Sequence, residues 1–322
     1  MSEKIKLGVN RLNKKNFWST FGVPIALVVI CVVLAFNTKM FLSVENIFNI
    51  LRTISIIAVA AIGSTFILIS GGIDVSVSAV MACAGVMCVA LMKTTGMGFL
   101  PAVIISVGAG ALIGVCNGLI ITKIKIPAFI ATLGTMQIIR GATFIYTQGY
   151  SVYGENMPTA FEFVGRGYFG VVPVPVVIMI ALFVIFWFVA NKTILGQHVY
   201  AVGSNEKSSY LFGINVTKTR ILVYMIGGIT AAIAGILFAA RLQSAQAGAA
   251  TGMEFDILTA AVLGGVSIYG GKGKIERTLL GALVIGVINN GMTLMNISSF
   301  YQMVASGSIL IIALALDRIN SD

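Results

Sequence analysis

Long apolar runs separated by short polar segments recur along the whole chain, and this pattern restricts the fold more than any single motif. An α-helix needs about 20 apolar residues to cross a hydrocarbon layer of about 30 Å. Of the 322 residues, 58% are hydrophobic and only 10% are charged, and the mean hydropathy is +1.00. The pattern therefore predicts an integral membrane protein, with an all-α fold built as a polytopic transmembrane helical bundle.

Hydropathy predicts ten spans, which lie near residues 17–36, 53–70, 76–92, 99–121, 127–147, 172–190, 221–240, 256–269, 278–295 and 301–316. The first apolar run follows a basic segment, as in a signal peptide, but it is long and no small-x-small cleavage site follows, so we expect a retained span. The predicted organisation is an N-terminal segment (1–16), a first transmembrane half (17–190), a polar loop (191–220), a second half (221–316) and a tail (317–322).

The positions of lysine and arginine predict the orientation, because the cytoplasmic loops of membrane proteins are enriched in these residues. With the N-terminus inside, fifteen of the 21 basic residues fall in inside segments, five fall outside, and Arg140 lies within the fifth span. Removing or adding one early span would invert most loops and destroy this bias. Both termini and the 191–220 loop are therefore predicted to be cytoplasmic, in a multi-pass protein of the cell (inner) membrane.

The net charge of +10 does not indicate nucleic acid, because the basic residues lie in short segments between apolar runs and not on a solvated domain. The cysteines Cys31, Cys83, Cys88 and Cys116 all lie within apolar runs, and the chain has one histidine. We interpret the cysteines as small packing residues. The sequence predicts no metal site and no cofactor.

Two similar stretches support the span count from another direction. GALIGVCNG at 110–118 in the fourth span is echoed by GALVIGVINNG at 281–291 in the ninth. Spans five apart in a ten-span chain cross the membrane in opposite directions, so the echo predicts an inverted repeat of five-span halves, which is common in transporters. The alternative is that small residues resemble one another in any helix bundle.

The segment SGGIDVSVS at 70–78 combines a glycine pair with Asp74 close to the membrane, where a charged group is costly and usually functional. Asp74 could cap the third span as an N-terminal carboxylate, or it could line the path of a solute. Asn117, Asn289 and Asn290 lie at the ends of the echoed helices. They could bind hydroxyl groups of a solute, although asparagine in a bundle more often links two helices.

The sequence does not indicate an enzyme. The segment VLGGVSIYGGKGK at 262–274 contains Gly-Gly-Lys, but Val266 and Gly273 stand where a phosphate-binding loop requires glycine and a hydroxyl residue. The acidic residues Asp74, Glu254 and Asp256 all lie near predicted span ends, which leaves the predicted interior nearly uncharged. Such a chain suits a passive pathway for a neutral polar solute; the alternatives are a stand-alone channel or secondary carrier, and an intramembrane enzyme.

The 191–220 loop is the longest polar run between the two apolar halves. A short helix is predicted from Asn205 to Leu211, ended by Gly213. Such a helix could dock on a separate subunit that supplies energy, or the loop could be solvated without any partner.

Six blocks in order resemble the membrane permeases of ABC-type monosaccharide importers, the ribose permease family. They are SGGIDVSVSAV at 70–80, IPAFIATLGTM at 126–136 followed by Arg140 and Gly141, LGQHVYAVGSNEKSSYLFGINV at 195–216, RLQSAQAGAATGMEFDILTAAVLGGVSIYGGKG at 241–273, GALVIGVINNGM at 281–292 and SSFYQM at 298–303.

The resemblance implies a translocation subunit for a neutral monosaccharide, ribose first, that hydrolyses nothing itself. Its implied partners are two cytoplasmic ATP-binding subunits, an extracytoplasmic sugar-binding protein and a second permease copy, in a homodimer or pseudodimer surrounded by membrane lipid. The implied ATPase-coupling loop contains Gly196, Gly203, Asn205, Glu206 and Gly213, with Ser208 and Ser209 where the family usually has alanine.

A second predicted contact surface concerns the extracytoplasmic side. Arg241, Glu254 and Asp256 flank a predicted outer loop and could pair with charges on the binding protein. Pairing among these three residues is an equally good explanation. The 148–171 loop is a further candidate surface.

Overall fold

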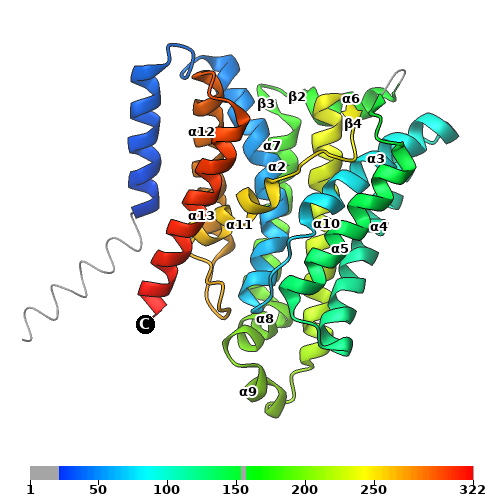
Figure 1. The fold of residues 1–322 in the computed structure, drawn as a ribbon, viewed down its shortest axis with the longest axis vertical. Coiled ribbons are helices and arrows are strands. Elements are labelled where there is room, and N and C mark those ends of the chain that lie inside the picture. The colour runs from blue at the N-terminus through cyan, green and yellow to red at the C-terminus, as the bar shows by residue number, and fades with distance from the viewer. Residues whose placement is uncertain (1–21, 154–156, 322) are drawn as a thin grey trace, which may run out of the picture.

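A computed structural model of the protein describes residues 22–153 and 157–321, and most of them are helical (Figure 1). Besides the helix at Gly22–Asn37, the helices are α2 (Val44–Ile69), α3 (Val77–Thr95), α4 (Phe99–Leu119) with the π-helical turn η1 (Ile120–Ile124), α5 (Ala128–Thr147), α6 (Thr159–Arg166), α7 (Val174–Lys192), α8 (Ile194–Ser204), α9 (Glu206–Leu211), α10 (Val216–Leu242), α11 (Met253–Leu263), α12 (Ile275–Leu294) and α13 (Ser299–Ser321). The predicted segment 1–16 lies outside the described residues.

Seven helices of the described chain are long and apolar enough to cross a membrane: α2, α3, α4 with η1, α5, α7, α10 and α12. Two shorter apolar helices lie at Gly22–Asn37 and Ser299–Ala315. Together with α11, these helices occupy the positions of the ten predicted spans. The prediction of an all-α, polytopic helical bundle is confirmed.

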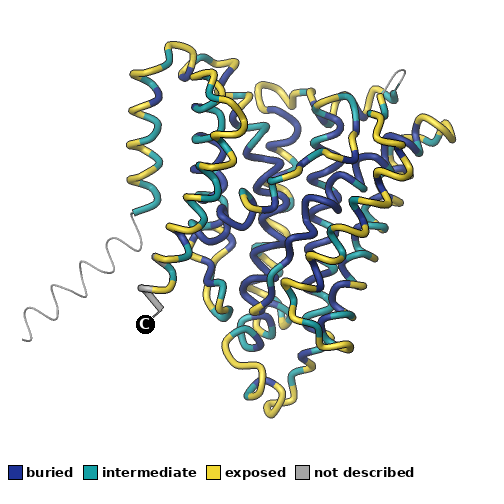
Figure 2. Tube along the Cα trace, viewed as in Figure 1, coloured by how far each residue is buried: buried dark blue, intermediate teal, exposed yellow. Residues whose placement is uncertain are grey.

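Helices α2 and α10 form the centre of the bundle, and α4 and α5 lie at its periphery (Figure 2). In their most apolar windows, 83% of α2 and 67% of α10 is buried, against 22% for α4 and for α5. Glycines allow α10 to approach its neighbours closely: a Cβ atom at Gly228 would lie 2.0 Å from the carbonyl oxygen of Gly110, and one at Gly235 would lie 2.0 Å from that of Met81. Backbone approach of this kind is typical of helix packing in membranes.

Two of the predicted span boundaries differ from the structure. Helix α2 begins at Val44 and not near residue 53, and the Ser43 side chain accepts a hydrogen bond from the Asn46 N–H at its start. Helix α11 ends at Leu263, because the chain turns at Gly264 and Gly265, which has a φ of +83°. Since α11 has only 11 residues, it is too short to cross a membrane alone.

Short strand pairs close the end of the bundle opposite α9, which we call the β4 end; the other end is the α9 end (Figure 1). Strand β1 (Val152–Tyr153) pairs antiparallel with β4 (Ser244–Ala245), and β2 (Tyr168–Phe169) pairs with β3 (Val172–Pro173). The β1–β4 pair joins the connection between α5 and α7 to the chain that follows α10, whereas β2 and β3 both lie within that connection.

The two echoed stretches lie on α4 and α12, which run in opposite directions through the bundle (Figure 1). Each half also has a long central helix, α2 or α10, that is followed by an extended break and a helix starting inside the bundle, α3 or α11. This correspondence agrees with the predicted inverted repeat.

Candidate functional site

The first break, between α2 and α3, contains Asp74 at the start of α3. Its carboxylate is 5% exposed, and Oδ1 accepts hydrogen bonds from the Ser76 N–H at 2.8 Å and the Ser76 hydroxyl at 2.6 Å. Ser76 is the N-cap residue of α3 and makes no side-chain cap bond, so Asp74 lies two residues before α3's cap position and accepts from the N–H of the cap residue. The carboxylate also lies inside the bundle and not at a span end.

Asn117 on α4 extends this polar network. Its amide donates to the Ser76 hydroxyl oxygen at 3.0 Å, and its own Oδ1 is buried with no partner among the described residues. The Ile73 carbonyl next to Asp74 accepts from the hydroxyls of Thr132 and Tyr224 at 3.3 and 3.2 Å. Side chains from α4, α5 and α10 therefore hold the first break in place.

The second break, between α10 and α11, has a similar arrangement of acidic and asparagine side chains. Glu254 is 8% exposed and its Oε2 accepts from the Gly252 N–H at 3.0 Å, and the Asp256 carboxylate accepts from the Asn289 amide on α12 at 3.0 Å. Asn117 and Asn289 occupy matching places in the echoed stretches, and each donates to an oxygen near the start of the helix after the break. Their contacts are those of residues that link helices.

Asn290 also links two helices. Its amide donates to Asn46 Oδ1 on α2 at 2.9 Å, and the Asn46 amide returns a bond to Asn290 Oδ1 at 3.1 Å. A reciprocal amide pair of this kind satisfies both side chains inside the bundle. The prediction of a solute contact at Asn117, Asn289 or Asn290 is untested, and all three side chains are engaged within the protein.

Arg140 on α5 joins the second break to the start of α3, and no role was predicted for it from the sequence. Its guanidinium donates to the carbonyl oxygens of Ala247 and Ala249, both at 2.9 Å, and to the Ser78 hydroxyl at 3.0 Å. Ala247 and Ala249 lie in the second break, and Ser78 lies in the first turn of α3. A charged residue within a span is expected to be functional. The position of Arg140 inside the fifth predicted span could therefore have indicated its role.

These findings correct the expectation of a nearly uncharged interior. Asp74 and Glu254 are buried, and Asp256 and Arg140 are partly buried within the bundle. The predicted span ends misled because α3 and α11 start inside the bundle (Figure 1). In the described residues, no group of three histidine, cysteine or acidic side chains could hold a metal ion.

At the β4 end, three arginines from different elements lie together. The Arg52 guanidinium donates to the Arg166 carbonyl at 3.2 Å, and the Arg166 guanidinium donates to the Arg241 carbonyl at 2.9 Å. Arg241 in turn donates to Thr53 Oγ1 at 2.9 Å and to Asn49 Oδ1 at 2.6 Å. Glu254 and Asp256, predicted beside Arg241 on an outer surface, lie instead on α11 within the bundle.

The polar loop 191–220 folds into α8 and α9, and α9 agrees closely with the predicted short helix. The Asn205 side chain caps α9 by accepting from the Ser208 N–H at 2.9 Å, and Gly213, with a φ of +82°, turns the chain after it. Glu206 forms an ion pair with Arg220 at 2.8 Å. Gly196 allows α8 to pack on the end of α7, where a Cβ atom would lie 2.1 Å from the Ala190 carbonyl oxygen.

The tip of this loop exposes large apolar side chains. Tyr210, Leu211 and Phe212 are 73%, 83% and 86% exposed, and they lie at the end of α9 that projects from the bundle (Figure 2). Three adjacent exposed apolar side chains add no stability to a solvated loop. Protein interfaces, in contrast, use large apolar and aromatic residues as anchors. The loop was predicted from the sequence, but these three residues were not singled out.

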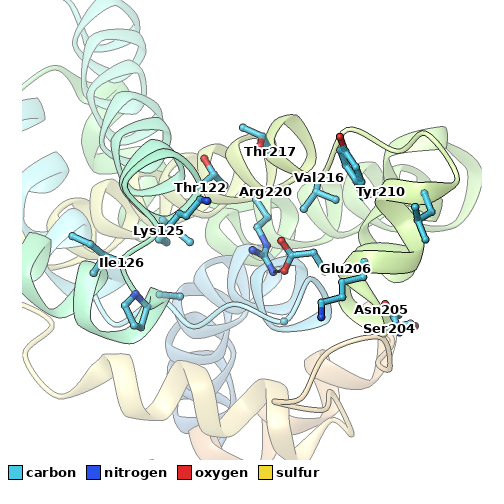
Figure 3. Close-up of a pocket in the computed structure, with 16 residues that line it drawn as sticks. Thr122, Lys125, Ile126, Ser204, Asn205, Glu206, Tyr210, Val216, Thr217 and Arg220 are labelled. Atoms are coloured by element: carbon cyan, nitrogen blue, oxygen red, sulfur yellow. Dashed lines mark hydrogen bonds and ion pairs between the residues drawn. The ribbon is translucent and has the colours of Figure 1, made fainter.

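A groove of about 1150 Å³ lies between α9 and the junction of α4 with α5 (Figure 3). The Glu206–Arg220 ion pair lies in its middle, with Lys125 on one wall and Asn205 on the other. Lys125, which has a φ of +63°, is the C-cap residue of η1. Pro127 is the N-cap residue of α5. The groove therefore places polar and charged groups beside the exposed apolar tip, where a protein partner could contact both.

The broken helices, the inverted halves and the projecting loop define a multi-pass membrane transport protein, and comparison with known proteins gives its family. The family profile described as branched-chain amino acid transport system / permease component matches residues 46–314. The chain belongs to this permease family, and it is a transport subunit and not itself an enzyme.

Full-length relatives agree with this assignment. The chain is 40% identical to a ribose import permease protein of Bacillus subtilis over 320 residues, which covers 99% of each chain. It is 40% identical to the ribose import permease protein of Escherichia coli K12 over 91% of this chain and 92% of the relative, and 35% identical to the D-allose transport system permease protein of the same strain over 95% and 93%. No solved structure matches significantly. The predicted resemblance is confirmed.

Proposed function

We propose that this chain forms the translocation pathway of an ATP-driven importer for a neutral monosaccharide, ribose or a similar sugar. The similarity to permeases named for ribose, allose and arabinose along nearly the whole chain supports the substrate class. The observation that carries the mechanism is the position of α9: a capped helix with an exposed apolar tip lies at one end of a bundle whose two helix breaks are inside it.

The α9 end is proposed to face the cytoplasm and to dock one of two ATP-binding subunits. Leu211 and Phe212 would enter an apolar cleft on the ATPase, and the groove beside α9 would receive polar groups of the same partner. The excess of lysine and arginine on this side supports the orientation, with both termini cytoplasmic in the cell (inner) membrane.

The β4 end is proposed to receive the sugar-binding protein. Arg52, Arg166 and Arg241 lie together there, and the structure gives none of the three an ion pair among the described residues. Arg166 is exposed, whereas Arg52 and Arg241 are half-buried. An exposed guanidinium group suits acidic side chains of a soluble partner, and such charges steer encounter and fix orientation. Glu254 is buried and is not available to a soluble partner in this conformation.

A second, identical permease copy is proposed to complete the pathway. Helices α4 and α5 are the least buried spans, so their outer faces are available to another copy or to lipid. Arg140 projects from α5 toward the second break and the start of α3, which places the central polar groups next to this poorly covered side.

The experiment is uptake of radiolabelled ribose by vesicles that contain the purified chain. The ATPase and the binding protein are each present or absent, and ATP is placed inside or outside. We expect uptake only in the complete system with ATP on the α9 side. Uptake by this chain alone would identify a channel or secondary carrier and would contradict the proposal.

A further inference from the structure

Three chain segments meet at the α9 end through close contacts that are mostly between backbone atoms. They are the end of α2 at Ile69–Gly71, the end of α8 at Gly203–Ser204, and the loop between α11 and α12 at Gly270–Gly271. The Gly271 N–H donates to the Ile69 carbonyl oxygen at 2.8 Å. We call the four residues Gly71, Gly203, Gly270 and Gly271 the glycine joint.

The joint is too tight for a methyl group at several positions. A Cβ atom at Gly203 would lie 1.7 Å from the Ile69 carbonyl oxygen and 2.7 Å from the Gly271 nitrogen. A Cβ atom at Gly270 would lie 2.7 Å from the Gly203 carbonyl oxygen and 2.9 Å from the Gly71 Cα atom. Because these neighbours are backbone atoms, a methyl group can be accommodated only if the segments move apart.

Each segment of the joint leads within a few residues to a part of the molecule already described. Gly203 and Ser204 directly precede Asn205, the cap of α9. Gly71 lies three residues before Asp74 in the first break. Gly270 and Gly271 lie between α11, which follows the second break, and α12.

Further contacts hold the loop between α11 and α12, which contains Gly270 and Gly271, in place. The Tyr200 hydroxyl on α8 donates to the Gly273 carbonyl oxygen at 2.9 Å. Burial, followed by the nearby Glu276 carboxylate, raises the pKa of this phenol. On the other side, the Asp317 carboxylate of α13 accepts from the Ser267 hydroxyl at 3.1 Å. The loop is therefore held to α8 and to α13 and is expected to move with them.

We infer that the glycine joint transmits movement of α8 and α9 to the break at Asp74, and that Gly203, Gly270 and Gly271 are positioning residues for ATP-driven transport. The inference rests on the proposed function. Backbone segments in direct contact have no flexible side chains to absorb a displacement, so a shift of α8 must move the end of α2 and the α11–α12 loop. This gives a contiguous physical route from the docking helix to the pathway.

The main test compares Gly203→Ala with the wild-type chain in the complete reconstituted importer. Gly203 lies within α8 and has no positive φ, so alanine suits the helix, and only the contact with Ile69 and Gly271 is disturbed. To restore even 3.0 Å from the Ile69 oxygen, the segments must part by about 1.3 Å. We expect the ATPase to remain bound and active while the sugar imported per ATP falls about 3- to 30-fold, the range that corresponds to typical coupling energies.

Gly307→Ala on α13 is the matched control, because it is also a helical glycine and a Cβ atom there meets nothing within 4 Å. It is expected to import as much sugar per ATP as the wild type.

The outcomes for the proposed function and for the glycine joint can be told apart. A wild-type complex without ATP-dependent uptake contradicts the proposed function. A wild-type complex that imports sugar, together with a fully coupled Gly203→Ala variant, overturns only the role of the joint.

If Gly203→Ala is not recovered in the membrane, Tyr200→Phe still tests the role of the glycine joint. It removes the hydroxyl bond to Gly273 and adds no volume, so we expect a normal amount of protein and a smaller loss of sugar per ATP. Wild-type coupling in both Tyr200→Phe and Gly270→Ala would overturn the inference.

Discussion

Replacing Arg140 with methionine should separate a role in transport from a role in stability. The substitution removes three hydrogen bonds, at 2.9, 2.9 and 3.0 Å, that join α5 to the second break and to the start of α3. Bonds between helices in membranes contribute about 0.6 kcal/mol each, so their loss costs about 2 kcal/mol in stability. Removing a charge from the membrane interior returns about 2.5–3.5 kcal/mol.

The two terms nearly cancel, so the thermal stability of Arg140→Met in detergent should stay within about 2 kcal/mol of the wild type. Uptake should nevertheless fall at least about tenfold, because a coupling energy of about 1.4 kcal/mol between the breaks is enough for that factor. Arg140→Lys is the control that keeps the charge, but its single ammonium group cannot reproduce the planar fork that reaches three acceptors. It should retain part of the uptake.

The assays are thermal unfolding of the purified permease and ATP-driven uptake in vesicles, both normalised to the amount of protein in the membrane. Wild-type uptake by Arg140→Met would refute the reasoning. If Arg140→Met unfolds at a much lower temperature than the wild type, and its uptake falls only as much as the amount of folded protein, Arg140 has a structural role instead.

Three further predictions concern the two ends of the molecule. Leu211→Asp together with Phe212→Asp should abolish co-purification of the ATPase without lowering the amount of permease in the membrane, and retention of the ATPase would remove the apolar tip from the interface. Arg166→Glu should weaken docking of the binding protein more at about 0.01 M than at about 1 M salt, because salt screens exposed charges, and equal docking at both would contradict a charge contact. A cysteine at Ser208 should react only with reagents that reach the cytoplasm; labelling from outside would invert the topology.

The sequence predicted those parts of the fold that depend on local patterns. The polar loop became α8 and α9 because Asn205 caps α9 and Gly213 ends it, and both signals lie within the loop. The glycine pair before Asp74 follows the end of α2 at Ile69, where Gly71 has a φ of +79°. The start of α2 could not be predicted in this way, since Asn46 and Asn49 are polar residues whose partners, Asn290 and Arg241, come from distant parts of the chain.

The same reason explains what the sequence missed in the site. Arg140 bonds to backbone carbonyls more than one hundred residues away, and no local pattern indicates which carbonyls a guanidinium will reach. The glycine joint combines Gly71, Gly203 and Gly270, which are widely separated in sequence and look like ordinary turn residues until their backbones touch. Gly203 was predicted only as part of the coupling loop, and the Gly-Gly-Lys segment was weighed only as a nucleotide site.

The buried carboxylates decide between a permease and an ion-coupled carrier. A carrier needs acidic groups that are free to take up and release an ion, whereas Asp74 and Glu254 each accept a backbone N–H at the start of a helix, where they satisfy groups that the helix leaves open. Arg140 cannot serve as a relay because its guanidinium does not lose its proton in proteins. The contacts of Asp74, Glu254 and Arg140 therefore favour a role in holding the breaks in place, which agrees with the proposed entry of energy through α9. Uptake that collapses with a protonophore while ATP is held constant would reverse this argument and make Asp74 the first residue to test for ion coupling.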